Sequence, residues 1–197
     1  MIQALLRELY ATSAAEFLAV ALGLIYVLLI LKRNRLGWLA GAGSSIIYVY
    51  LAARAHLPMQ SVLQFYYVIM SVYGWSNWTR AQQEGGGIGR WPVRNHLLAL
   101  LAIALLSVLT AQWLRRETHA AWPYLDSMTT WISLFATWLL ARLKLENWLY
   151  WIAADSVMAY LFAAQGYPFT TALFLTYMVI AVFGFREWLN KYRLQSP

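Results

Sequence analysis

Long apolar segments separated by short polar ones dominate this chain. The three longest runs without any Asp, Glu, Lys or Arg are residues 55–79, 95–114 and 156–185. Each run can hold a helix of about 20 residues, which is the length that crosses the hydrocarbon core of a bilayer. The pattern therefore predicts an integral membrane protein whose spanning elements are helices.

Seven spans can be drawn between the loop signals, together forming a single membrane domain over residues 1–197. Their predicted ranges are 15–31, 36–53, 59–78, 96–113, 124–141, 147–164 and 168–188. The longest loop, 81–94, contains three consecutive glycines and is expected to be a flexible connection, because no P-loop motif follows them. Before the first span, Arg7 and Glu8 interrupt the apolar pattern. This favours a short interfacial helix over a signal peptide.

Composition and charge support a membrane protein and argue against several other classes. Hydrophobic residues make up 61% of the chain and charged residues only 12%, whereas a soluble domain is nearer one quarter charged. The formal net charge of +7 comes from basic loops between apolar segments, so we expect no nucleic-acid partner. The absence of cysteine excludes disulfides and cysteine-bound metals.

The distribution of basic residues predicts the orientation. Eleven of the 15 Lys and Arg residues fall on the side that also holds the C-terminus, and four fall on the other side. The positive-inside rule places the C-terminus in the cytoplasm and the N-terminus outside. We expect a multi-pass protein of the bacterial inner membrane.

An internal repeat runs through the chain without gaps at an offset of 110 residues. The aligned identities include Trp38 with Trp148, Pro58 with Pro168, Tyr67 with Tyr177, Gly74 with Gly184, and Trp78 with Trp188. Apolar bias inflates matches between leucines and alanines, but it does not align Pro, Gly, Tyr and Trp. The chain is therefore predicted to be a duplicated three-span unit.

The repeat predicts an all-α, 3+1+3 architecture. Residues 15–78 form the first three-helix bundle, 124–188 the second, and the Leu/Ala-rich span 96–113 links them. A single linking span restores the chain direction, so the two bundles are parallel repeats. This is the plan of SWEET-type transporters, which place their substrate at the repeat interface and transport it by alternating access.

Asp155 is a carboxylate about halfway along the span 147–164. An ionised group at that depth costs a few kcal/mol, so it should face the protein interior or water. Three interpretations are open: a protonated side chain bonded to a neighbouring helix, a counter-charge for a cationic substrate, or a proton-coupling site. The counter-charge is the one we favour.

Trp148 and Trp151 share a helix face with Asp155, at positions i, i+3 and i+7. Indole faces attract flat aromatic cations by stacking and cation–π interaction, worth about 1–2 kcal/mol in a desolvated site. Trp148 lies near the end of its span, so an alternative role at the membrane interface is open for it. The face as a whole favours a substrate that is flat, aromatic and positively charged.

Positions at which the two repeats differ are further candidates for substrate-binding residues. The partners of Trp151 and Asp155 in the first bundle are Gly41 and Ser45, so bulk and charge occur on one side only. Gln64 aligns with a phenylalanine and would need a polar partner, either the ligand or a neighbouring helix. Tyr67 and Tyr177 occupy equivalent positions in the two repeats, and we expect them to line the substrate path.

Enzymatic and metal chemistry find no support in the sequence. The three histidines fall at loops or span ends without metal-ligand spacing, and no HExxH or GxSxG motif occurs. A membrane-embedded enzyme would need a second acid or base near Asp155, and the spans show no obvious one. We expect no catalytic residue, no metal and no cofactor.

The sequence resembles the PnuC family of bacterial vitamin transporters. The resemblance is carried by Trp148, Trp151 and Asp155, which match the WxxWxxxN/D motif tied to substrate binding in that family, and by "QFYYVIMSVYGWSNW" and "GYPFTTALFLTYMVIAVFGFREW". It implies the 3+1+3 fold and uncoupled, facilitated uptake. It also implies that a cytosolic kinase keeps the flux inward by phosphorylating the vitamin, without stable binding to the transporter.

The resemblance implies a B-vitamin substrate, either thiamine (the PnuT type) or nicotinamide riboside (the PnuC type). Both carry a permanently cationic aromatic ring that suits a site of Trp and carboxylate. We expect thiamine, because the carboxylate of Asp155 can also bind its aminopyrimidine ring; nicotinamide riboside is the alternative. A sugar carrier of the SWEET type and proton-coupled uptake are the rival functions, and a homo-oligomer is compatible with the sequence.

Overall fold

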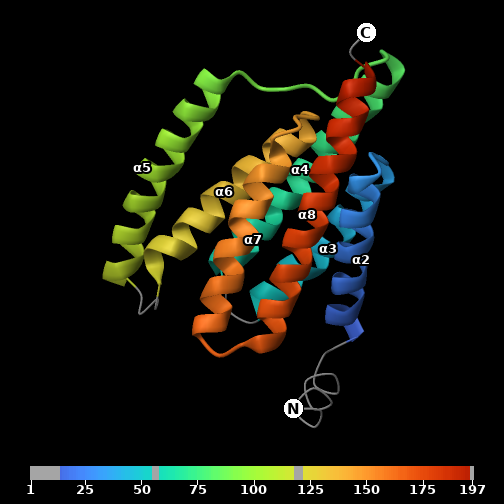
Figure 1. Cartoon of the computed structure of the whole chain (residues 1–197). Helices are drawn as coiled ribbons and strands as arrows, with labels where there is room; N and C mark the ends of the chain where they lie inside the picture. Colours follow the sequence, from blue (N-terminus) through green and yellow to red (C-terminus); the bar gives the residue numbers. More distant parts are fainter. Residues whose placement is uncertain (1–13, 55–57, 118–121, 196–197) are drawn as a thin grey trace. The chain divides into compact units, whose positions relative to one another are not determined.

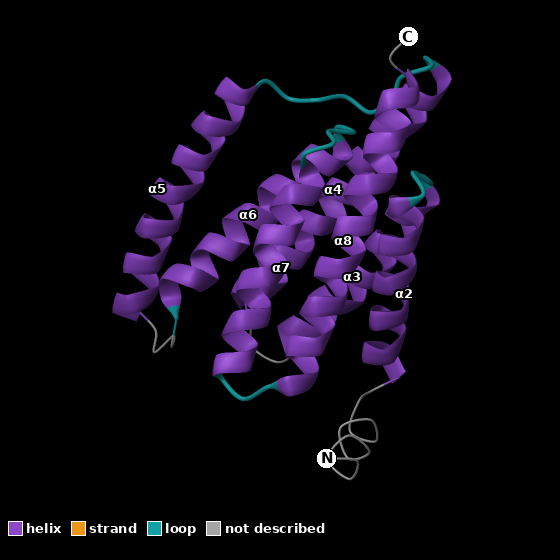
Figure 2. Cartoon of the chain, viewed as in Figure 1, coloured by secondary structure: helices purple, strands orange, loops and turns teal. Residues whose placement is uncertain are grey.

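The computed structural model describes residues 14–54, 58–117 and 122–195, and within them the chain is helical. The helices are α2 (Ala14–Leu31), α3 (Leu36–Arg54), α4 (Pro58–Gln83), α5 (Val93–Glu117), α6 (Pro123–Ala141), α7 (Asn147–Ala164) and α8 (Pro168–Gln195). Figures 1 and 2 show these elements, with no strand in the described part of the chain. The predicted all-helical fold is confirmed. The proposed N-terminal interfacial helix lies outside the described residues.

The helix boundaries follow local sequence signals. Helices α6 and α8 begin at Pro123 and Pro168, where proline loses no intrahelical hydrogen bond. Helix α7 ends in a turn at Gly166, where φ is +79°. Glycine adopts this left-handed conformation readily because it has no Cβ. The amide of Tyr167 then bonds to the carbonyl of Phe162 at 2.9 Å, which satisfies one of the last carbonyls of the helix.

Four of the described helices are long and apolar enough to cross a membrane. They are α2, α3, α5 and the segment Thr170–Gln195 of α8. Helices α4, α6 and α7 are not among the four. Two of these three, α4 and α7, carry most of the polar and aromatic residues singled out in the sequence. A helix of that kind must turn its polar groups away from lipid and towards protein or water.

The helices form two compact units that divide between Glu84 and Gly85. In the first unit, α3 packs against both α2 and α4. In the second unit, α6 packs against α5 and α7, and α7 packs against α8. The linking helix α5 therefore belongs to the second unit.

The glycine-rich loop before α5 is held in place more firmly than a flexible connection would be. Gly89 exchanges backbone hydrogen bonds with Leu143 and Leu145 on the α6–α7 loop, at 3.0 and 2.9 Å. Glu146 accepts bonds from Arg90 Nε at 3.0 Å and from the Trp91 amide at 3.2 Å. The sequence expectation of a plain flexible loop was thus wrong for residues 88–91, because it could not see their partners about 55 residues away.

In the first unit, two tryptophans that meet edge-on join α3 to α4, an arrangement that we call a tryptophan cross. Trp38 is 1% exposed and meets Trp78 edge-on, with ring centroids 5.5 Å apart at 88°. Its ring lies on Gly74, where an added Cβ would overlap the indole atoms.

The second unit repeats this cross between α7 and α8. Trp148 is 3% exposed and meets Trp188 at 5.6 Å and 85°. A Cβ on Gly184 would come within 2.6 Å of the Trp148 ring. The sequence repeat therefore corresponds to a repeated packing unit, and glycine is needed where the indole approaches the facing helix.

We expect Gly184→Ala to destabilise the protein. The added Cβ meets a rigid, buried ring, and overpacking of this kind costs about 1–3 kcal/mol. Thermal unfolding of the purified protein in detergent measures the effect. Gly23→Ala is the matched control, because its Cβ would find only an ordinary contact with Ser44 at 3.5 Å. Equal melting temperatures for the two variants would contradict the tight contact.

Candidate functional site

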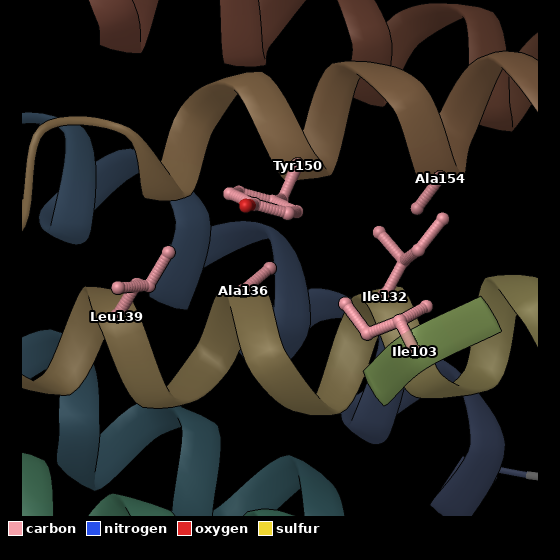
Figure 3. Packing of buried hydrophobic residues seen from close by; sticks show 6 residues of the cluster. All are labelled: Ile103, Ile132, Ala136, Leu139, Tyr150 and Ala154. Carbon is pink, nitrogen blue, oxygen red and sulfur yellow. The ribbon is translucent and has the colours of Figure 1, made fainter. Parts of the chain in front are cut away.

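Asp155 lies on α7 between two residues that each contact a neighbouring helix. Ala154 packs into the core cluster between α7 and α6, where Figure 3 shows it beside Ile132. On the other side, the Ser156 hydroxyl bonds to Met178 Sδ of α8 at 3.2 Å. Since successive helical residues are about 100° apart, Asp155 points between the directions of α6 and α8.

The carboxylate of Asp155 is buried but has no partner in the described part of the chain. The residue is 6% exposed, and none of the described residues forms a hydrogen bond or ion pair with it. A buried ionised group normally requires a paired charge or several hydrogen-bond donors. Of the three interpretations open from the sequence, a hydrogen bond to a neighbouring helix is therefore not formed within the described residues.

Trp151 is partly buried and lies one helical turn before Asp155 on α7. It packs against the cluster formed by Ile103, Ile132, Ala136, Leu139, Tyr150 and Ala154. Figure 3 shows Tyr150 and Ala154 of this cluster pointing from α7 towards α6. The indole is thus held from one side and keeps part of its surface outside the core.

Trp148 has a different environment from Trp151. It takes part in the cross with Trp188 and Gly184, and its indole nitrogen has no hydrogen-bond partner among the described residues. Its repeat partner Trp38 has both properties as well. The packing assigns Trp148 to the contact between α7 and α8.

The remaining predicted residues divide between the two units. Tyr177 lies on α8 next to Met178, and so at the level of Asp155, and it meets the ring of Phe174 edge-on at 6.2 Å. Gln64 and Tyr67 lie on α4 in the first unit. Gln64 is half-buried, with no hydrogen bond to any described residue. Trp148, Trp151, Asp155 and Tyr177 therefore belong to the second unit, and Gln64 and Tyr67 to the first.

A second cluster of polar residues, near the start of α7, was not predicted from the sequence. Glu146 is buried beside Arg90, and His96 Nδ1 lies 3.0 Å from the hydroxyl of Tyr150. These contacts tie the start of α5 to α7. In the sequence, Glu146 is only the last charged residue of the loop "RLKLE", and no local pattern indicates that it pairs with Arg90. Among the described residues, no group of three His, Asp or Glu could hold a metal ion.

Comparison with known proteins fits this arrangement. Residues 13–190 match the nicotinamide mononucleotide transporter family. The chain belongs to this family. The resemblance to PnuC transporters seen in the sequence is therefore confirmed, and the protein is a membrane-embedded vitamin transporter and not an enzyme.

Two relatives of this transporter are named for the vitamins that they carry. It is 25% identical over 182 residues to the riboflavin/roseoflavin transporter RibM of Streptomyces davaonensis, covering 89% of this chain and 84% of the relative. It is 26% identical over 159 residues to the nicotinamide riboside transporter PnuC of Escherichia coli, covering 67% of this chain and 66% of the relative.

A solved structure shares the fold of this transporter. The crystal structure of the vitamin B3 transporter PnuC matches 99% of this chain and 88% of the other, with a TM-score of 0.75 and 22% identity. At that identity the likeness shows the fold alone. It confirms the predicted all-helical fold.

Proposed function

We propose that this transporter carries a cationic B-vitamin across the bacterial inner membrane by facilitated diffusion and alternating access, with its C-terminus in the cytoplasm. Asp155 supplies the counter-charge, and Trp151 supplies the flat surface on which the ring stacks. The observation that carries the proposal is the buried carboxylate of Asp155, which has no partner within the described residues and lies one turn from an indole. Binding a cation there satisfies a charge that is otherwise costly to bury.

Nicotinamide riboside is the leading substrate of this proposal. The expectation of thiamine rested on Asp155 alone, and neither of the two curated relatives described above is named for thiamine. PnuC of Escherichia coli is named for nicotinamide riboside, whose pyridinium ring is permanently charged. Thiamine stays the second candidate, because a carboxylate at position 155 can pair with its thiazolium charge and also accept bonds from its aminopyrimidine.

Binding to the purified protein tests the substrate class. We expect nicotinamide riboside or thiamine to bind with at least tenfold higher affinity than riboflavin, whose ring is neutral. Isothermal titration with the three vitamins in the same detergent gives the ranking. Tightest binding of riboflavin would refute the counter-charge role, and binding of thiamine alone would reverse the order of the two cationic candidates.

The other predicted contacts extend this site. We propose that Tyr177 contributes an aromatic wall at the level of Asp155, and that Trp148 chiefly fixes α7 against α8. The roles of Gln64 and Tyr67 as vitamin contacts stay predictions from the sequence, to be tested by the same binding measurement. Trapping by a cytosolic kinase and formation of a homo-oligomer also stay predictions.

A further inference from the structure

Two phenylalanine rings stack near the turn between α7 and α8. Phe162 and Phe174 are almost parallel, with centroids 5.4 Å apart and an interplanar angle of 7°. Tyr167 lies edge-on to Phe162 at 6.0 Å, and Tyr177 lies edge-on to Phe174 at 6.2 Å. We call these four residues the turn-side aromatic cluster.

The stacked pair is absent from the first repeat. At an offset of 110 residues, Phe162 corresponds to Ala52 and Phe174 to Gln64. Ala52 is 6% exposed, so α3 packs well at this position without a ring. By contrast, the tryptophan crosses that join the helix pairs occur in both units with the same geometry. Joining two helices of this fold therefore does not require the phenylalanines, which points to a role specific to the second unit.

The position of the cluster relates it to Asp155. Phe162 follows Asp155 by seven residues, which places it two turns further along the same face of α7, a rise of about 10 Å. The contact between Ser156 and Met178 fixes the register of α8, so that Tyr177 lies level with Asp155. Phe174 then lies one turn closer to the α7–α8 turn. The cluster covers the stretch between that turn and the carboxylate.

We infer that Phe162 and Phe174 form a second, weaker stacking position, which an aromatic vitamin occupies on its way to Asp155 from the side of the α7–α8 turn. The inference rests on the proposed function, in which Asp155 and Trp151 hold the vitamin. Phenyl faces attract a flat cationic ring by stacking and cation–π interaction, as indoles do, but less strongly. With no charged group in the cluster, the ring is held briefly and released. The pair therefore speeds entry without adding to the final affinity.

Leucine substitutions test this position. Phe162→Leu, Phe174→Leu and the double variant keep an apolar side chain of similar size and remove the aromatic face. We expect the double variant to lower the initial uptake rate into liposomes roughly three- to tenfold at substrate concentrations far below KM. The equilibrium Kd of the purified protein should stay within about twofold of the wild type, because Asp155 and Trp151 are untouched. Phe162→Trp should retain wild-type uptake.

Controls separate this inference from the proposed function. Phe183→Leu, at an exposed position on the same helix as Phe174, should import at the wild-type rate. Wild-type uptake by the double variant would overturn the inference, and so would a Kd that weakens by the same factor as the rate. Asp155→Asn in the same preparation tests the proposed function independently. If a leucine variant fails to fold, as judged by gel filtration, Phe162→Tyr and Phe174→Tyr with retained uptake support the need for a ring, and loss of uptake in these folded variants overturns it.

Discussion

Asp155→Asn is expected to weaken binding of a cationic vitamin at least tenfold, which corresponds to about 1.4 kcal/mol. Asparagine keeps the size of the side chain and one acceptor oxygen, but it replaces the second oxygen with an NH2 donor and removes the charge. Because the carboxylate is buried and has no partner in the described part of the chain, its attraction to a bound cation is weakly screened. The measurement is the Kd of nicotinamide riboside and of thiamine for the purified variant.

Asp126→Asn is the matched control for this substitution. Asp126 lies at the exposed first turn of α6, so loss of its charge should leave vitamin affinity unchanged. Asp155→Asn should also be no less stable than the wild type without ligand, because it removes a charge that is costly to bury. A folded Asp155→Asn protein with wild-type affinity for both cationic vitamins would refute the counter-charge role.

Trp151→Leu is expected to weaken binding by roughly tenfold, in line with the 1–2 kcal/mol of a desolvated cation–π contact. Leucine retains apolar contact with the cluster between α6 and α7 but offers no electron-rich face. Trp151→Phe should restore part of the loss, since it returns a smaller aromatic surface. Titration of the three proteins with the same vitamin gives the comparison.

Trp131 provides the control for packing. It contacts the same hydrophobic cluster from α6, and its indole nitrogen donates to Thr110 at 3.1 Å. Trp131→Leu should lower the melting temperature without changing Kd. If Trp151→Phe bound no better than Trp151→Leu, the loss would belong to packing rather than to the aromatic face.

Much of the fold could be predicted because its signals are local. The predicted span 147–164 coincides with α7, and the first two spans agree with α2 and α3 to within one residue. The ends of α4 and α8 were underestimated, since both continue past the apolar core to Gln83 and Gln195. Residues such as Arg and Gln favour the helix as well as apolar residues do, so hydrophobicity marks where a span leaves the membrane and not where its helix stops.

The candidate site was predictable only in part. The spacing of Trp148, Trp151 and Asp155 placed all three on one face of a helix, but it could not distinguish the environments of the two tryptophans. The repeat carried that information in principle, because Trp38 and Gly74 align with Trp148 and Gly184. Recognising Trp148 as a packing residue required the distance between α7 and α8 at that point.

By itself, the sequence determined the helical membrane fold, the duplication, the family and the likeness of Asp155 to a binding group. The fold follows from hydrophobic periodicity and composition, the duplication from identities at a fixed offset of 110 residues, and the family from the resemblance of Trp148, Trp151 and Asp155 to a known motif. Only the tertiary structure decided that Trp148 is enclosed by α8, that Glu146 holds the loop before α5, and that Phe162 stacks on Phe174. Such contacts depend on how each helix is rotated and shifted against its neighbour, which is set by the packing of many side chains at once.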